Sequence, residues 1–193
     1  MNERALRTQA DKYRLDPLVS PRYRPILVSD SKGLTLQTQV RVNHETFLEF
    51  WCESGATAEN RLQYLRDNLE HELRQPGSKP ICLFIWVGTC NLTKKDGQFI
   101  YLKSQTNSEV TKLCNTYIYH FGRQFEDVKL IFLHLPVYST FHWNSYKNIG
   151  IDVTKFWSDD KILHEQIRTV NEYIIRSQPY PARHRSKVFG GFA

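Results

Sequence analysis

Long apolar segments, cysteine pairs and low-complexity regions are missing from this chain of 193 residues. The longest apolar run, residues 81–87, is the length of a strand, well short of the ~20 residues that span a bilayer. The first residues also lack the apolar stretch of a signal peptide. We therefore expect a protein without a membrane span, with an intracellular and cytoplasmic location.

Cysteine, glycine and proline are scarce. The four cysteines, Cys52, Cys82, Cys90 and Cys114, form no Cys-x-x-Cys pair and have no zinc-type spacing to histidine. The sequence therefore predicts neither a metal nor another cofactor. Cys82 and Cys114 fall at apolar positions and are interpreted as reduced core thiols. With 9 Gly, 8 Pro and 40% hydrophobic residues, the chain is typical of a globular domain and excludes collagen-like or disordered proteins.

Charge is unevenly distributed along the chain. The formal net charge is +6, with six basic and three acidic residues over 1–24 and four basic and no acidic residues over 176–193. Residues 25–175 carry 16 basic and 17 acidic side chains, so the central part is nearly neutral. This pattern disfavours a nucleic-acid footprint across the folded domain and predicts weak, salt-sensitive nucleic-acid contact through the basic ends.

Apolar runs and amphipathic stretches alternate from residue 25 onward. Four runs have the length and composition of strands, and three stretches repeat apolar residues at helical spacing. The strand runs are 25–29, 47–51, 81–87 and 129–135, and the helical stretches are 58–75, 108–122 and 163–174.

Strands that alternate with helices build parallel sheets covered on both faces. The sequence therefore predicts an α/β fold, a three-layer α/β/α sandwich with a central parallel sheet of four or five strands. The predicted domain covers residues 25–176, between a basic extension over 1–24 and a basic tail over 177–193. Sites in such sheets lie beyond the carboxyl ends of the strands. The loops in question are 29–33, 54–57, 88–92 and 136–143.

Short polar motifs follow the predicted strands in a defined order. They are Ser29-Asp30-Ser31, Ser54-Gly55, Gly88-Thr89-Cys90-Asn91 and a late pair formed by Asp160 and His164. In this order they resemble the motifs of the SGNH, or GDSL, hydrolase family: a Gly-Asp-Ser turn, an isolated Gly, a Gly-x-Asn turn and an Asp-x-x-His. The resemblance covers nearly the whole predicted domain. It implies a flavodoxin-like sheet and hydrolysis of acetyl or short-acyl esters.

The resemblance also implies a role for each matching residue. Ser31 would attack the ester carbonyl, His164 would be its general base and Asp160 would orient the imidazole. The oxyanion would be held by Ser31, Gly55 and Asn91. Donors aimed in advance at developing negative charge stabilise the transition state, so the implied arrangement is physically consistent.

Two departures from the family pattern weaken this assignment. Cys90 stands where the family has its oxyanion asparagine, which shifts Asn91 by one position, and a thiol is a poor hydrogen-bond donor. Asp160 and His164 are spaced Asp-x-x-x-His rather than Asp-x-x-His. Residues four apart still share a helix face, although this spacing differs from that of the family.

The histidines have more than one interpretation. His164 is either the base or a solvated residue at the start of a helix. His142 lies on a loop of the expected active face and is the reserve base, whereas His134 is interpreted as a core histidine of the last strand. Aromatic residues near His142 line an acyl or aryl pocket in one interpretation and form a hydrophobic lid in the other. They are Tyr138, Phe141, Trp143 and Tyr146.

A second resemblance concerns the sequence segments around Phe50-Trp51-Cys52 and Trp86-Val87-Gly88. These segments are similar to the SGNH-like domains of some non-LTR retrotransposon first-frame proteins. Three functional hypotheses therefore stand. They are a serine esterase acting on a small ester or acylated substrate, a non-catalytic binding or assembly module of a nucleoprotein, and an α/β domain that binds a small ligand in the same crevice.

Overall fold

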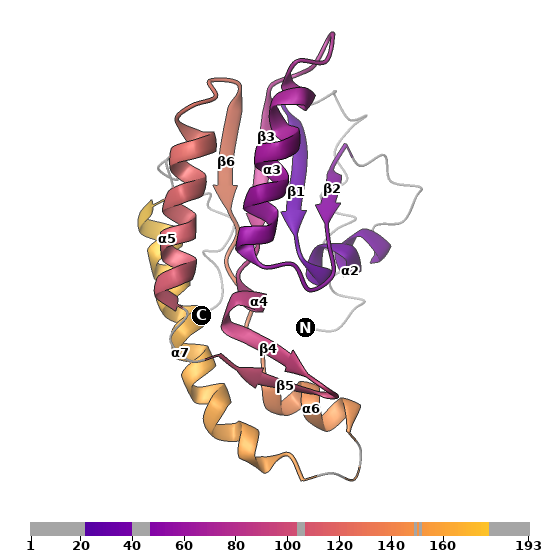
Figure 1. Ribbon diagram of the computed structural model, residues 1–193, viewed down its shortest axis with the longest axis vertical. Helices are drawn as coiled ribbons and strands as arrows, with labels where there is room; N and C mark the ends of the chain where they lie inside the picture. The colour runs from indigo at the N-terminus through magenta and orange to yellow at the C-terminus, as the bar shows by residue number, and fades with distance from the viewer. Residues whose placement is uncertain (1–21, 40–46, 104–106, 149, 151, 178–193) are drawn as a thin grey trace, which may run out of the picture.

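A computed structural model describes residues 22–39, 47–103, 107–148, 150 and 152–177 (Figure 1). Its main sheet has four strands: β1 (Arg24–Ser29), β2 (Glu49–Cys52), β3 (Ile81–Trp86) and β6 (Val128–Phe132). All pairings are parallel, and the order is β2-β1-β3-β6. The chain moves outward from β1 to β2 and then returns to β3 on the other side. The switch point for ligand binding therefore lies between the carboxyl ends of β1 and β3.

Three helices cover one face of this sheet. They are α3 (Ala58–Leu73), α5 (Asn107–Tyr117), which continues into the π-helical turn η1 (Ile118–Gly122), and α7 (Trp157–Ser177). Successive strand residues point to opposite faces, and alternate residues such as Ile26, Leu83 and Leu130 are fully buried against these helices. This apolar layer is the core of the domain.

The opposite face is covered near β1 and β2 by α2 (Ser31–Gln39). Gly33 permits this packing, because a Cβ placed there would lie 2.6 Å from the Cβ of Ser29 and 2.4 Å from the Sγ of Cys52. Ser29 and Cys52 point away from the Ile26 face. The three predicted layers, with a parallel sheet in the middle, are therefore confirmed.

A small lobe lies below the carboxyl ends of the strands (Figure 1). It contains the short helix α4 (Thr89–Leu92), an antiparallel hairpin of β4 (Thr93–Asp96) and β5 (Phe99–Leu102), and α6 (Thr140–Lys147), and the turn η2 (Thr154–Phe156) precedes α7. Asn144 of α6 is fully buried and forms hydrogen bonds with both backbone groups of Ile100 in β5. Its Oδ1 accepts from the Ile100 N–H and its Nδ2 donates to the Ile100 carbonyl, both at 2.8 Å.

Several predictions of detail can now be compared with the structure. Cys82 and Cys114 are buried free thiols, as predicted. Residues 93–102 form a hairpin, for which the sequence predicted no strands, and the helix over 140–147 overlaps the predicted loop 136–143. The helices that the structure describes do not combine the length and apolar character needed to cross a membrane. Most of the basic extension and tail, 1–21 and 178–193, lies outside the described residues.

Candidate functional site

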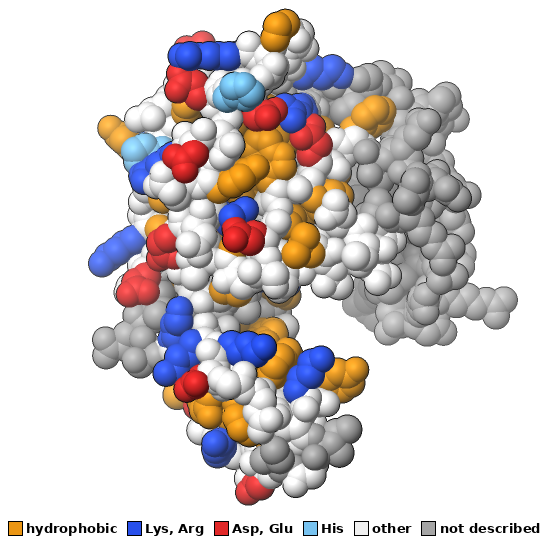
Figure 2. All heavy atoms as spheres, turned by 45° about the vertical axis from the view of Figure 1, so that its right-hand side comes forward, with side chains coloured by type: hydrophobic (Ala, Val, Ile, Leu, Met, Phe, Trp, Pro, Cys, Tyr) orange, Lys and Arg blue, Asp and Glu red, His pale blue; other side chains and the backbone are white. Residues whose placement is uncertain are grey.

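A cavity of about 450 Å³ opens at the carboxyl edge of the sheet, between the main body and the small lobe. We call it the crevice. Figure 2 shows the molecule hollowed there, with basic side chains gathered on the lobe beside the hollow. The crevice is lined by residues from the loops after β1, β2 and β3, from the hairpin and from the segment around α6. They are Asp30, Ser31, Lys32, Ser54, Gly55, Thr57, Thr89, Cys90, Thr93, Lys94, Lys95, Ile100, Lys103, Tyr138 and Trp143.

The ionisable lining of the crevice is strongly cationic. Four lysines, Lys32, Lys94, Lys95 and Lys103, are among the lining residues, with one carboxylate, Asp30. Lys94 and Lys95 are exposed, and neither forms an ion pair with a described residue. The nearly neutral average of residues 25–175 conceals this local concentration of positive charge. A crevice lined in this way favours a negatively charged occupant.

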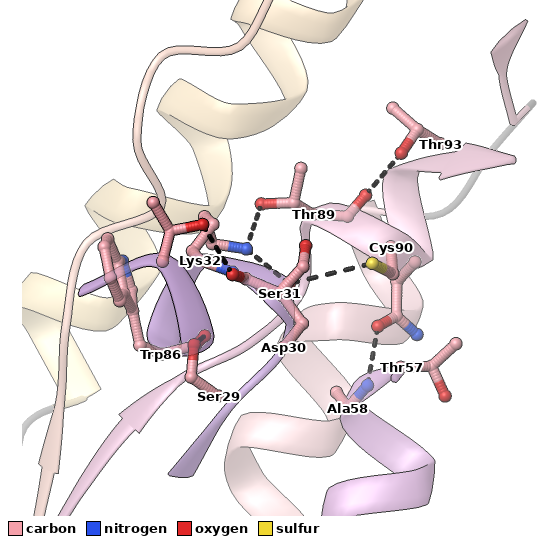
Figure 3. Close-up of polar contacts among 12 residues, drawn as sticks. Ser29, Asp30, Ser31, Lys32, Thr57, Ala58, Trp86, Thr89, Cys90 and Thr93 are labelled. Atoms are coloured by element: carbon pink, nitrogen blue, oxygen red, sulfur yellow. Dashed lines mark hydrogen bonds and ion pairs between the residues drawn. The ribbon is translucent and has the colours of Figure 1, made fainter. Parts of the chain in front are cut away.

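Asp30 is already satisfied inside the protein. Its side chain is 1% exposed and forms an ion pair with Lys32 Nζ, which also donates to Thr89 Oγ1 at 3.1 Å (Figure 3). The other Asp30 oxygen accepts the backbone N–H of Lys32 at 3.0 Å, in the first turn of α2. Asp30 and Lys32 therefore join the start of α2 to the loop after β3, and Asp30 leaves little negative charge for the crevice.

Ser31 lies beside this network with its hydroxyl free. The residue is exposed at the first position of α2, and none of the described residues forms a hydrogen bond with its Oγ, as its bare side chain in Figure 3 shows. Gly55 lines the same crevice from the turn after β2, where its φ of 74° suits glycine. The structure therefore brings Ser31 and Gly55, two of the predicted site residues, to one cavity.

Cys90 also lines the crevice, at the position where the family pattern has its oxyanion asparagine. Its Sγ lies 3.7 Å from Asp30 Oδ2. Burial, together with the negative charge of Asp30, raises the pKa of the Cys90 thiol to about 11. The thiol therefore stays protonated at neutral pH and is a weak nucleophile.

Asn91 points away from the crevice and into the protein. It is 4% exposed, its Oδ1 accepts the Ala58 N–H at 2.8 Å, and its Nδ2 donates to the Glu59 carboxylate at 2.7 Å. Burial opposes ionisation of Glu59, but this hydrogen bond and others outweigh it and lower the pKa of Glu59. The amide of Asn91 thus holds the first turn of α3, where the resemblance implied an oxyanion donor.

Asp160 is likewise occupied by backbone and hydroxyl groups. Its carboxylate accepts from the Ser139 hydroxyl and, at 2.7 Å each, from the Thr140 N–H and Thr140 hydroxyl. Although burial opposes its ionisation, these hydrogen bonds and the Phe141 N–H lower the pKa of Asp160. Asp160 therefore caps α6 from α7, and no hydrogen bond joins it to a described histidine.

The structure does not bring a described histidine to the crevice. His164 lines a second cavity, beside α7, which shares no lining residue with the crevice. His142 is exposed on α6 and contacts Phe141, with 5.4 Å between the ring centroids. His134 lies beyond the end of β6 and is exposed, so its interpretation as a core histidine was wrong. The predicted alignment of Ser31, His164 and Asp160 is thus absent from the described geometry.

An aromatic wall completes the crevice opposite the main body. Tyr138 and Trp143 line it together with Ile100, whereas Phe141 packs against Trp157 and Tyr146 is 77% exposed. Burial and the nearby acidic groups raise the pKa of Tyr138 to about 12, so its phenol stays neutral. Within the described part of the chain, Trp143 stacks on no aromatic ring and its indole N–H has no acceptor.

The hairpin lysines were not predicted as site residues, whereas Tyr138 and Trp143 belong to the aromatic group that one interpretation of the sequence placed in a pocket. The dipeptide Asp96-Gly97, followed by the apolar run 99–102, is a hairpin signal that places Lys94 and Lys95 on a strand. Gly97 has a φ of 57° in this turn. No comparable signal in the sequence shows that the hairpin folds back over the carboxyl ends of β1 and β3.

No family model and no curated protein matches the chain. Among solved structures, a lipase/acylhydrolase from Enterococcus faecalis is similar over 78% of this chain and 70% of its own, with 14% identity and a TM-score of 0.41. No conclusion about the activity of this chain follows from so distant a likeness.

Proposed function

We propose that the chain is a ligand-binding domain whose crevice takes a small anionic molecule. The observation that carries this proposal is the charge of the crevice, where four lysines accompany a single carboxylate already paired with Lys32. This charge supports the ligand-binding hypothesis drawn from the sequence and favours a negatively charged ligand.

The surroundings of the lysines support the same function. Ser31 and Ser54 supply hydroxyl donors on the main body, and the hairpin lysines line the crevice with them. Lys103 is fixed by a 3.2 Å hydrogen bond from its Nζ to the Cys90 carbonyl, and the buried Asn144 anchors β5 beside it. Cations and hydroxyls held by a folded frame bind an anion with little loss of side-chain freedom.

Pyrophosphate is the probe that tests this proposal. We expect wild-type protein to bind it saturably, one per chain, and the double variant Lys94→Gln with Lys95→Gln to bind it about tenfold more weakly, because each exposed charge contributes roughly 0.5–1 kcal/mol. Titration calorimetry at two salt concentrations measures the affinity and its salt dependence. The double variant should also show a smaller salt dependence.

The matched control removes two lysines elsewhere. Lys112 and Lys161 are exposed on α5 and α7 and do not line the crevice. The variant Lys112→Gln with Lys161→Gln should bind pyrophosphate like the wild type. Equal losses in the two double variants would assign the binding to overall charge and overturn the crevice, as would the absence of saturable binding to the wild type.

Ester hydrolysis at Ser31 is a second candidate function, favoured by one observation. The free hydroxyl of Ser31 and the Gly55 turn face the same crevice, which is the arrangement that a serine nucleophile and an oxyanion donor need. A base is what this candidate lacks, because the described residues place no histidine in the crevice.

A covalent probe separates the two candidates. If binding is the function, a fluorophosphonate should fail to label the protein, and p-nitrophenyl acetate should turn over no faster with wild type than with Ser31→Ala. The comparison with Ser31→Ala removes background hydrolysis at surface lysines. Labelling that disappears in Ser31→Ala and persists in Ser54→Ala would establish the hydrolase instead.

A further inference from the structure

The aromatic wall and the lysines of the crevice lie side by side. In the β4–β5 hairpin, Lys95 pairs with Ile100. Both backbone groups of Ile100 are held by Asn144, the residue that follows Trp143 in α6. The backbone of Lys95 is therefore connected through Ile100 to the helix that carries Trp143. Cation and flat ring face one cavity from neighbouring positions.

Trp143 is available to a ligand. It is half-buried, it lines the crevice, and in the described part of the structure it packs on no other aromatic ring. Tyr138, whose hydroxyl has no described hydrogen-bond partner, lines the same wall. Tyr138 also packs against the hydrophobic core, whereas the indole of Trp143 offers a face on which a planar ring can stack.

We propose that the anionic ligand of the crevice is a nucleotide, whose phosphate lies at the lysines of the crevice and whose base stacks on Trp143. This inference rests on the proposed anion-binding function and adds the class of ligand. A cavity of about 450 Å³ is within the ~300–1,000 Å³ typical of small-molecule sites. Ser31 and Ser54, from the loops after β1 and β2, carry hydroxyl groups that can hydrogen-bond a ribose or a phosphate oxygen.

The experiment compares AMP with ligands that each lack one part of it: ribose 5-phosphate lacks the base and adenosine lacks the phosphate. We expect AMP to bind at least tenfold more tightly than either, because base stacking and phosphate contacts contribute separately. A stacked base should also quench the fluorescence of Trp143, whereas ribose 5-phosphate should not. Affinities come from calorimetry and the stacking signal from fluorescence.

Tryptophan variants locate the base. Trp143→Leu should lose the preference for AMP over ribose 5-phosphate together with the quenching, and Trp143→Phe should retain most of the preference because it keeps a ring. Trp157→Leu is the matched control, since Trp157 is 59% exposed and packs on Phe141 outside the crevice. If Trp143→Leu fails to fold, Trp143→Phe and the wild-type ligand series still decide the outcome.

The outcomes separate the two proposals. Equal affinities for AMP and ribose 5-phosphate, both weakened by Lys94→Gln with Lys95→Gln, would overturn the nucleotide and leave the anion-binding function standing. A preference for AMP that survives in Trp143→Leu would also overturn the proposed stacking site. Failure of pyrophosphate, ribose 5-phosphate and AMP alike to bind would overturn the anion-binding function itself.

Discussion

Replacing Asn91 by alanine is expected to destabilise the domain by about 2–4 kcal/mol, because it removes two buried hydrogen bonds and leaves their partners unsatisfied. The Ala58 N–H loses its acceptor, and the Glu59 carboxylate loses the donor at 2.7 Å. The Ala58 carbonyl accepts from the buried hydroxyl of Tyr117 at 2.7 Å, so Ala58 is held on both sides by side chains from distant segments. Asn91→Ala releases one of these two attachments of α3.

Thermal unfolding measures this loss. For a chain of this size we expect a fall in Tm of roughly 5–15 °C. Asn68→Ala is the matched control. Asn68 lies in α3 itself, but it is half-buried and donates only to the Tyr64 carbonyl, at 2.8 Å. Its loss should be about 1 kcal/mol. Equal effects of the two substitutions would contradict the buried role of Asn91.

Asn91→Asp tests the Glu59 contact separately. The new carboxylate can still accept the Ala58 N–H, but it places a second negative charge beside Glu59. We expect this variant to be destabilised at pH 7 and to recover part of its stability as the pH falls and one of the two carboxylates takes up a proton. A variant as stable as wild type at pH 7 would mean that Glu59 is not held by Asn91.

The fold was largely predictable from the sequence, because buried strands and helices have characteristic spacings of apolar residues. The largely buried strand β3 appears as the continuous apolar run 81–87, and α3 and α7 repeat leucine, isoleucine and valine at helical spacing. The hairpin and α6 carry weaker patterns. The two strands of the hairpin have only four residues each and are partly exposed. Helix α6 depends on tertiary contacts such as the cap formed by Asp160.

The candidate site was less predictable, because motif order does not fix side-chain direction. Ser31 and Gly55 line the crevice because they lie in the loops just beyond the carboxyl ends of β1 and β2. Asn91 is one residue beyond Cys90 in the short helix α4, and that single step turns its amide into the protein. His164 belongs to a long helix, α7, so its direction follows the helix surface and the cavity beside it.

Asp160→Asn is expected to cost about 1–3 kcal/mol at neutral pH, because the carboxylate is the acceptor for the start of α6. It receives the Thr140 N–H and the Ser139 and Thr140 hydroxyls, and it connects α7 to the helix that carries Trp143. A neutral amide accepts with only one oxygen and lacks the charge that favours a helix N-terminus. The same substitution should therefore weaken AMP binding by displacing α6.

The pH dependence identifies the carboxylate as the cause. The pKa of Asp160 is lowered in the folded protein, whereas an unfolded aspartate has a pKa of about 3.9. Its stabilisation is therefore fully present above roughly pH 4–5 and is lost as the pH falls through the folded pKa. The difference in stability between wild type and Asp160→Asn should shrink toward pH 3 in thermal melts.

Asp159→Asn is the control, because Asp159 is one residue away and has no described hydrogen-bond partner. Its difference in stability from wild type should be small at every pH. A gap for Asp160→Asn that stays constant from pH 7 to pH 3 would mean that the charge of Asp160 does not hold α6.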